Sequence, residues 1–203
     1  MTGAPPIVVA ITGASGAPYA VRLLQQLVAA ERRVSLIVSK YGMRLLETEA
    51  GIGSMEALRT AVGQDAWNAC VETFSNDDRG AAPASGSSLT AGMIICPCSM
   101  GTLSAISVGA SRSLIERAAD VTLKERRKLV LVPRETPLSA IHLGNMLRLT
   151  RAGAVVMPAS PGFYHRPKQV SDLVDFVVAR MLDQLGVEQK LVERWEGEQT
   201  SRT

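Results

Sequence analysis

An arginine and a glutamate follow directly after an apolar run in the second half of the chain. Residues 129–133 read LVLVP, which is typical of a buried strand, and Arg134 and Glu135 come next. In open α/β sheets, ligands bind at the carboxyl ends of the strands. Arg134 could therefore bind an anion, and Glu135 could move a proton. The plainer alternative is a surface ion pair, which is worth at most about 1 kcal/mol.

A glycine-containing turn follows the first apolar run. Residues 7–12 read IVVAIT and predict a strand, and the turn 13–16 (GASG) leads into a helical pattern. The turn is neither G-x-G-x-x-G nor a P-loop, and Ser39 stands where a dinucleotide site needs an acid, so an NAD site is disfavoured. Two interpretations stay open. The N–H groups at the helix start bind an anion, or Ser15 caps the helix of an ordinary tight turn.

Three further loops carry polar side chains suited to an anion. The turn 99–102 (SMGT) follows the apolar run 93–98, and the loop 83–88 (PASGSS) is either a linker or a segment that closes over a ligand. Helix capping alone is the alternative for the turn. Tyr164 lies in a proline-rich loop, where its hydroxyl could reach a phosphate. Arg180 lies beside the apolar stripe of a helix, where most arginines only cover the edge of the core.

The elements that must position these residues alternate along the whole chain. This alternation favours a three-layer, Rossmann-like α/β fold, with a mostly parallel sheet covered by helices on both faces. No linker or repeat divides the chain, so residues 1–203 are expected to form one domain, with an ordered core from about 6 to 195 and a polar tail at 196–203. We expect strands at 7–12, 34–39, 70–74, 93–98, 129–133 and 154–158, and helices at 17–30, 41–50, 101–109, 113–127, 138–151 and 170–185.

Composition excludes several classes of protein. The net charge is +3 and the basic residues are scattered, apart from KERRK at 124–128, which argues against nucleic-acid binding. No apolar run approaches the roughly 20 residues of a membrane span, and the chain does not start like a signal peptide. The 3 cysteines and 2 histidines form neither a disulfide framework nor a metal pattern. We therefore expect a metal-free cytoplasmic protein that binds neither nucleic acid nor membranes.

Taken together, eight segments resemble the UbiX-type flavin prenyltransferases. The resemblance runs from about residue 7 to 195, with the segments in order and at compatible spacing. The segments are TGASG at 12–16, VSKYG at 38–42, PASGS at 83–87, CPCSMGTLS at 96–104, ERAADVTLKERR at 116–127, LVPRETP at 131–137, HLGNM at 142–146 and PGFYHRP at 161–167.

The resemblance implies an activity that spacing alone does not. Enzymes of this family join reduced FMN to dimethylallyl monophosphate, and the product is FMN prenylated at N5 and C6. Prenylated FMN serves as the cofactor of UbiD-type decarboxylases, including the one of ubiquinone biosynthesis. The family also implies a flavodoxin-like sheet, chemistry without a metal, and a homododecamer.

The resemblance also implies roles for particular residues, each at a position that matches a family motif. The residues implied to bind FMN are Gly13, Ala14, Ser15, Ser39, Ser99, Met100, Gly101, Thr102 and Arg134. Those implied to bind the prenyl phosphate are Ser85, Gly86, Arg117, Lys124, Tyr164, Arg180 and Trp195, the last of which is expected to help close the pocket. The implied catalytic residues are Ser15, Lys124 and Glu135.

The chemistry agrees with these roles. Negative charge grows on the phosphate as the allylic carbon–oxygen bond breaks, and Lys124 and Arg180 could stabilise it in place of a metal. Glu135 is the candidate for proton movement, and Ser15 could orient groups near flavin N5. Two alternatives remain: an FMN-dependent cysteine decarboxylase of the same fold, disfavoured because no histidine precedes His142, and a non-catalytic flavin carrier.

Overall fold

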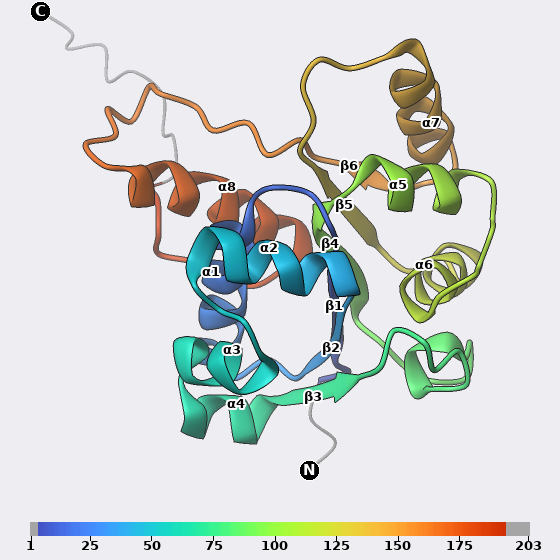
Figure 1. Ribbon diagram of the computed structural model, residues 1–203, viewed down its shortest axis with the longest axis horizontal. Coiled ribbons are helices and arrows are strands. Elements are labelled where there is room, and N and C mark those ends of the chain that lie inside the picture. Colours follow the sequence, from blue (N-terminus) through green and yellow to red (C-terminus); the bar gives the residue numbers. More distant parts are fainter. Residues whose placement is uncertain (1–3, 194–203) are drawn as a thin grey trace, which may run out of the picture.

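A six-stranded, entirely parallel sheet forms the centre of the molecule (Figure 1). The computed structural model describes residues 4–193. The strands are β1 (Ile7–Ile11), β2 (Val34–Val38), β3 (Val71–Phe74), β4 (Gly92–Cys98), β5 (Leu129–Pro133) and β6 (Val155–Val156). The helices are α1 (Ala17–Ala29), α2 (Lys40–Ala50), α3 (Met55–Val62), α4 (Gln64–Cys70), α5 (Met100–Ser107), α6 (Leu114–Lys124), α7 (Ala140–Arg151) and α8 (Val170–Leu185), with a short 3₁₀ turn η1 (Ala82–Ala84).

The strand order is β3-β2-β1-β4-β5-β6, so the chain first builds outward from β1 and then returns to its other side. The order therefore reverses between β1 and β4. In sheets of this kind the crevice at the carboxyl ends of the two central strands is where ligands bind. The pairing of β4 with β5 is irregular between Ile95 and Cys98, at the same end. Irregularities of this kind often lie beside active sites.

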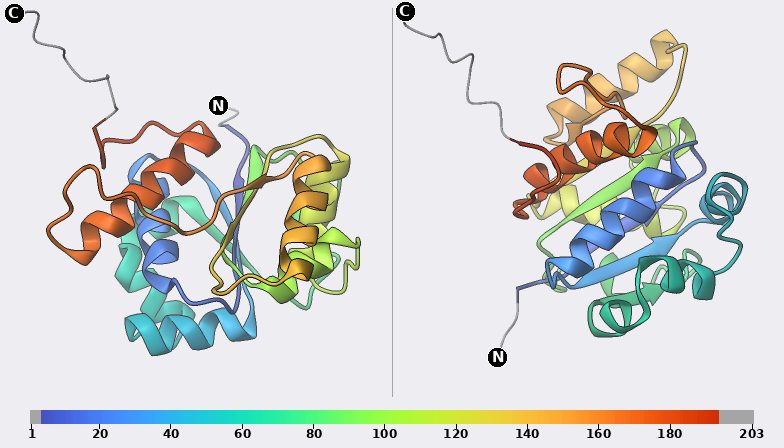
Figure 2. Two further views of the ribbon diagram at one scale, coloured as in Figure 1. Left: turned by 90° about the horizontal axis from the view of Figure 1, so that it is seen from above. Right: turned by 90° about the vertical axis from the view of Figure 1, so that its left-hand side faces the viewer.

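Two apolar cores hold the helices against the two faces of the sheet. Figure 2 shows these helices on either side of the strands. Alternate side chains of a strand point to opposite faces. Ile7, Val9 and Ile11 pack with α1 and α8 on one face, whereas Val8 and Ala10 pack with α5, α6 and α7 on the other. The three-layer arrangement predicted from the sequence is confirmed. Among the described residues, no helix is long and apolar enough to cross a membrane.

Two segments differ from the sequence-based expectation. The weakly patterned stretch 51–69 forms α3 and most of α4, which are short helices that bury only Leu58, Val62 and Trp67. Cys70 ends α4 and does not start β3. At the other edge, β6 has only 2 residues where five were expected. Its pairing continues less regularly, since the N–H groups of Met157 and Ala159 still donate to β5 carbonyls at 2.8 and 3.0 Å.

Candidate functional site

The ends of β1 and β4 are joined by one buried hydroxyl. Thr12 is 2% exposed, and its Oγ1 donates a hydrogen bond to the Pro97 carbonyl oxygen at 2.8 Å. Thr12 Oγ1 also accepts a hydrogen bond from the Ser99 N–H at 2.8 Å. Because Thr12 follows β1 and its side chain bonds to Pro97 and Ser99 at the end of β4, it holds the turn 13–16 and the start of α5 in a fixed relation.

The start of α5 forms one wall of the edge. The Ser99 hydroxyl accepts from the Thr102 N–H at 3.2 Å and donates to the Thr102 hydroxyl at 3.0 Å, so Ser99 caps α5. Apart from its chain neighbours and the backbone of α5 itself, no atom of the described residues lies within 4 Å of the position that a Cβ at Gly101 would occupy. Met100 is half-buried beside it. The helix start is therefore open to a ligand anion.

The start of α2 forms the opposite wall. The Ser39 hydroxyl caps α2 by accepting from the Gly42 N–H at 3.0 Å, and the Ser39 N–H donates to the Ile11 carbonyl at 3.0 Å. The turn 13–16 packs closely on α2, because a Cβ at Gly13 would lie 2.5 Å from the Tyr41 Cβ. Only glycine permits this approach, which brings Ser39 and the turn to one edge.

A glutamate that sequence reasoning missed occupies the start of α1. One carboxylate oxygen of Glu49, Oε2, accepts from the N–H groups of Gly16 and Ala17, each at 2.8 Å. Gly16 is the N-cap residue that precedes α1, and this N-cap residue makes no side-chain capping hydrogen bond. The alternative interpretation, in which Ser15 caps α1, is therefore wrong. The anion at this helix start is a carboxylate from the end of α2.

The charge of Glu49 is stabilised by groups of the same turn. Partial burial works to raise the pKa of its carboxyl, but the Gly16 and Ala17 N–H groups, the Ser15 hydroxyl and the Arg134 guanidinium together lower it. Arg134 also donates from Nε to the Ser15 carbonyl at 3.3 Å. Ser15, Glu49 and Arg134 therefore form one polar cluster at the reversal point of the sheet.

Glu135 extends from the same strand end as Arg134. Its side chain is exposed, and Oε1 accepts from the Thr136 N–H at 3.1 Å. The structure thus brings the candidate flavin residues of the turns 13–16 and 99–102, together with Ser39 and Arg134, to one edge, with Glu135 beside them. These residues therefore lie together at the edge where the strand order reverses.

A second group of predicted residues lies at the opposite edge of the same chain. Lys124 ends α6 just before β5 begins, and a Cβ at Gly86 would lie 2.8 Å from the Lys124 Nζ. Arg127 holds the loop there by donating to the Gly86 carbonyl at 2.7 Å. Lys124 and Arg134 flank β5, whose 5 residues span about 16 Å at the usual strand rise. We call the edge with the turns 13–16 and 99–102, Ser39 and Arg134 the flavin edge. Lys124 and the loop with Ser85 are therefore remote from the flavin edge of their own chain.

Arg117 lies on the same helix, α6, seven residues before Lys124. Its guanidinium NH1 pairs with Asp120 Oδ2 one turn along the helix, at 2.8 Å. Both side chains are more than one-third exposed, so this pair contributes little to stability. Arg117 is therefore available on the surface of the chain.

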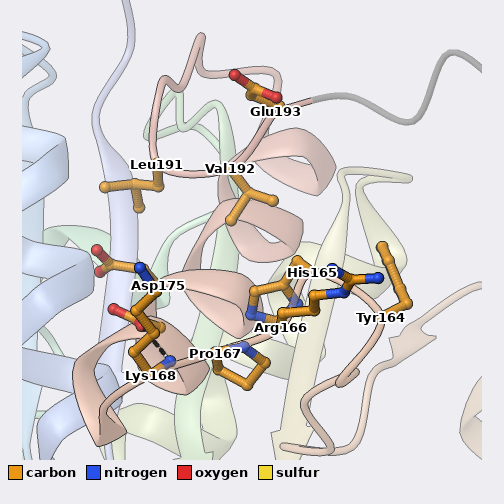
Figure 3. A pocket seen from close by; sticks show the side chains of 10 residues that line it. Tyr164, His165, Arg166, Pro167, Lys168, Asp175, Leu191, Val192 and Glu193 are labelled. Carbon is orange, nitrogen blue, oxygen red and sulfur yellow. Dashed lines mark hydrogen bonds between the residues drawn. The ribbon is translucent and has the colours of Figure 1, made fainter.

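Tyr164 and Arg180 form a third group, beside α8. Both line a cavity of about 340 Å³, together with Phe176 and the chain segment that ends the described residues. Arg180 NH1 pairs with Asp183 Oδ2 at 2.9 Å. Figure 3 shows the neighbouring pocket, which Tyr164 also lines. Trp195, the predicted closing residue, lies outside the described residues.

Buried thiols give a separate prediction. Cys96 and Cys98 are fully buried. Burial raises the pKa of the Cys98 thiol to about 12 and moves that of Cys96 still further from its ordinary value. Iodoacetamide is expected to leave both unlabelled in the native protein at pH 8 and to label them after unfolding, as mass spectrometry would show. Labelling of either thiol before Cys70, which is half-buried, would contradict this.

Among residues 4–193, no cluster of His, Cys, Asp or Glu could hold a metal ion.

The whole chain can be compared with known proteins. The model of the Flavoprotein family matches residues 1–182. The flavin prenyltransferase UbiX of Pseudomonas aeruginosa is 52% identical, over 98% of this chain and 97% of its own. That of Halalkalibacterium halodurans is 50% identical, over 92% and 91%. The chain belongs to the UbiX flavin prenyltransferase family.

Solved structures of UbiX proteins share the fold. One, crystallised with FMN and dimethylallyl pyrophosphate, has a TM-score of 0.88 and 42% identity, and the match covers 96% of this chain and 98% of that one. A dodecameric FMN-dependent UbiX-like decarboxylase from Escherichia coli O157:H7 has a TM-score of 0.87 and 44% identity, covering 95% and 100%. The cysteine decarboxylase TvaF is 14% identical with a TM-score of 0.60, so it shares the fold alone. The cysteine decarboxylase alternative is not favoured for a UbiX-family chain.

Proposed function

We propose that this chain transfers the dimethylallyl group of dimethylallyl monophosphate to N5 and C6 of reduced FMN, which makes prenylated FMN for a UbiD-type decarboxylase. The identity of about half of all residues to curated flavin prenyltransferases, over nearly the whole of both chains, carries the proposal. The complex of a UbiX protein with FMN and dimethylallyl pyrophosphate supports it.

FMN suits the edge at the reversal point of the sheet. The open start of α5 offers N–H groups to a phosphate, and the hydroxyls of Ser39 and Thr102 stand nearby as donors. Arg134 supplies a positive charge next to the turn 13–16. Reduced FMN, when bound, supplies the nucleophilic nitrogen and carbon of the reaction. The protein's own part is to orient these atoms and to handle protons through Ser15, Glu49 and Glu135.

We further propose that the prenyl phosphate site is assembled from several copies of the chain. Lys124, with Ser85 and Gly86, lies across the sheet from the flavin edge, and Tyr164 and Arg180 line a separate cavity. In one chain these groups therefore do not surround a single phosphate. A homododecamer like that of the Escherichia coli relative would bring such surfaces together. The cations would then stabilise the departing phosphate without a metal.

A cytoplasmic location completes the proposal. The described cysteines are free thiols, which suits a reducing compartment. The reaction also consumes reduced flavin, which such a compartment keeps available.

The deciding experiment is an anaerobic incubation with reduced FMN and dimethylallyl monophosphate, followed by the mass and absorbance spectrum of the bound flavin. The flavin is expected to gain one five-carbon unit. Folded protein that binds FMN but leaves its mass unchanged would contradict the proposal. Release of carbon dioxide from a cysteinyl peptide would favour the decarboxylase alternative instead.

Glu135 gives a direct prediction within this assay. The Glu135→Gln variant should bind FMN as the native protein does, because its side chain is exposed beside the edge. Prenylated flavin should form about 100-fold more slowly, the lower end of what a positioned acid or base contributes. Glu72→Gln, an exposed acid on β3, is the matched control and should keep full activity. Equal rates for both variants would remove Glu135 from proton transfer.

A further inference from the structure

Helix α7 carries apolar side chains on both of its sides. On the inner side, Leu149 is buried and Met146 packs against the core that α5 and α6 share. On the outer side, three large apolar side chains stand in solvent, since Ile141 is 72% exposed, Leu143 53% and Leu147 51%. A helix that is apolar all round is normally buried all round. The outer side of α7 is therefore a surface suited to a further contact.

The exposed side chains of α7 belong to one continuous surface. Ala140 and Gly144 lie between the three large side chains, because residues three and four apart are neighbours on a helix. Alternating large and small residues let a side chain from outside interdigitate with the helix. We call Ala140, Ile141, Leu143, Gly144 and Leu147 the outer face of α7. The helix itself lies at the outside of the molecule, beside α5 (Figures 1 and 2), and exposed apolar patches of this kind mark interaction sites.

The outer face of α7 starts close to the flavin edge. Ser139 caps α7 by accepting from the His142 N–H at 3.2 Å, and three residues separate it from Glu135. Even a fully extended segment of this length spans about 14 Å at most. Leu138, within that segment, is itself 41% exposed. A protein surface seated on the outer face would therefore lie beside Arg134 and Glu135.

A loop at the opposite edge of the sheet presents an apolar side chain to solvent. Leu89 is 71% exposed, three residues after Gly86. Arg127 donates to the carbonyl oxygens of Gly86 and Ser88, each at 2.7 Å, and to the Thr90 hydroxyl at 3.3 Å. Hydrogen bonds from a charged guanidinium are strong. They fix the loop on both sides of Leu89, so its exposure is built into the fold.

Leu89 and Lys124 belong to the same rigid unit. A Cβ at Gly86 would lie 2.8 Å from the Lys124 Nζ, so the lysine lies against this loop. Arg127, which holds the loop, follows Lys124 by three residues. A surface that binds Leu89 would therefore also place Lys124.

A second copy of the chain suits the outer face of α7. The UbiX-like relative from Escherichia coli O157:H7, 44% identical to this chain, is dodecameric. The proposed reaction, moreover, needs the Lys124 of one copy at the flavin edge of another. A contact between two different surfaces of one chain repeats from copy to copy, and it closes into a ring when the rotation between copies allows.

We infer that the outer face of α7 in one copy receives the Leu89 loop of a neighbouring copy, and that this contact carries the neighbour's Lys124 to the flavin edge. The inference rests on the proposed function, in which the phosphate site is shared between copies. Removal of Leu89, Leu143 and Leu147 from water drives the contact. The charged groups beside it stay available to the phosphate.

The mass of the assembly tests the surface. The double variant Leu143→Ser with Leu147→Ser, and separately Leu89→Ser, should lose the native assembly in light scattering. Their circular dichroism spectra should stay native, because the three side chains are exposed in the folded chain. Val170→Ser, which changes a 74% exposed side chain on α8, is the matched control and should keep the native mass. A native mass in either leucine variant would overturn the inference.

Cross-linking tests which surfaces meet. In a Cys70→Ala background, Leu89→Cys chains and Leu147→Cys chains carrying different tags are expressed together and treated with a short bismaleimide. The reagent should join one chain of each kind. If Leu147→Cys chains are joined to each other instead, α7 packs on α7 and the inference fails. Absence of the mixed product would contradict it as well.

The anaerobic assay connects the contact to the reaction. The double variant at Leu143 and Leu147 should form prenylated flavin about 100-fold more slowly, as when a group that stabilises developing charge is removed. Val170→Ser should keep the native rate. Full activity in a dissociated double variant would show that the contact does not deliver Lys124. If the native protein gives the mixed cross-link but no prenylated flavin, the proposed function fails while the contact between copies stands.

Discussion

The Glu49→Gln variant is expected to form prenylated flavin about 100-fold more slowly than the native protein. The substitution keeps the size of the side chain but removes the negative charge next to Ser15 and Arg134. Without that charge, the Ser15 hydroxyl loses its anionic acceptor, and the cluster loses a base that could take up a proton. Single-turnover measurements on protein loaded with reduced FMN would show the loss directly.

A measurement of unfolding free energy distinguishes a role of Glu49 in turnover from a role in helix capping alone. Glu49 accepts the Gly16 and Ala17 N–H bonds, so its loss is expected to cost about 1 kcal/mol of unfolding free energy, as for other caps. Glu47→Gln, an exposed acid two residues earlier on α2, is the matched control for both measurements. If Glu49→Gln loses stability but retains its turnover, the carboxylate serves only the helix start.

The polar cluster of Ser15, Glu49 and Arg134 also predicts how stability depends on pH. The pKa of Glu49 is lower in the folded chain than in the unfolded chain, so its contribution to stability is complete above the ordinary glutamate pKa. That contribution is lost as the pH falls through the lowered, folded-state pKa. The stability difference between the native protein and Glu49→Gln should therefore be constant at neutral pH and shrink only in acid. Denaturant titrations at several pH values would show it, and a difference that shrinks near neutrality would contradict it.

The residues at the flavin edge were predictable because each signal is local. Small residues and hydroxyls directly after an apolar run identify the turn 13–16 and the start of α5. This signal does not depend on how distant segments of the chain fold. Glu49 gave no such signal, since its bond to Gly16 joins residues 33 positions apart and depends on how α2 folds back. The missed helices α3 and α4 are short and bury too few side chains to produce a clear period.

The position of Lys124 shows what a family resemblance omits. Resemblance assigns Lys124 and Arg134 to one reaction, yet the helix that precedes a parallel strand must end at the strand's amino end. Lys124 ends α6 and Arg134 follows β5, so the two lie at opposite edges of the sheet. In the proposed reaction, the flavin edge of one copy of the chain would therefore meet the Lys124 side of another copy. Motif order alone contains no information of this kind.

The Gly42→Ala variant is expected to be destabilised by about 3 kcal/mol, which is large for the addition of one methyl group. Gly42 lies in the first turn of α2, and its backbone has an ordinary helical conformation, so the effect cannot come from conformational strain. A Cβ there would lie 2.4 Å from the Ile11 carbonyl oxygen and 2.9 Å from the Ile11 carbonyl carbon. Both atoms belong to the backbone of a central strand, which cannot rotate away as a side chain could. The start of α2 must therefore move.

This movement would displace the flavin edge as well. The Ile11 carbonyl accepts the Ser39 N–H, and the Ser39 hydroxyl caps α2, so a shift of α2 separates Ser39 from the turn 13–16. The melting temperature of Gly42→Ala should fall by about 10 °C, and its FMN affinity should fall with it. Gly144→Ala is the matched control, because among residues 4–193 nothing outside its chain neighbours and the backbone of α7 lies within 4 Å of its added Cβ, in the middle of that helix. That control should gain about 0.5–1 kcal/mol from its better helix propensity. If both variants melt alike and bind FMN as the native protein does, the contact between α2 and β1 is not the constraint that shapes this edge.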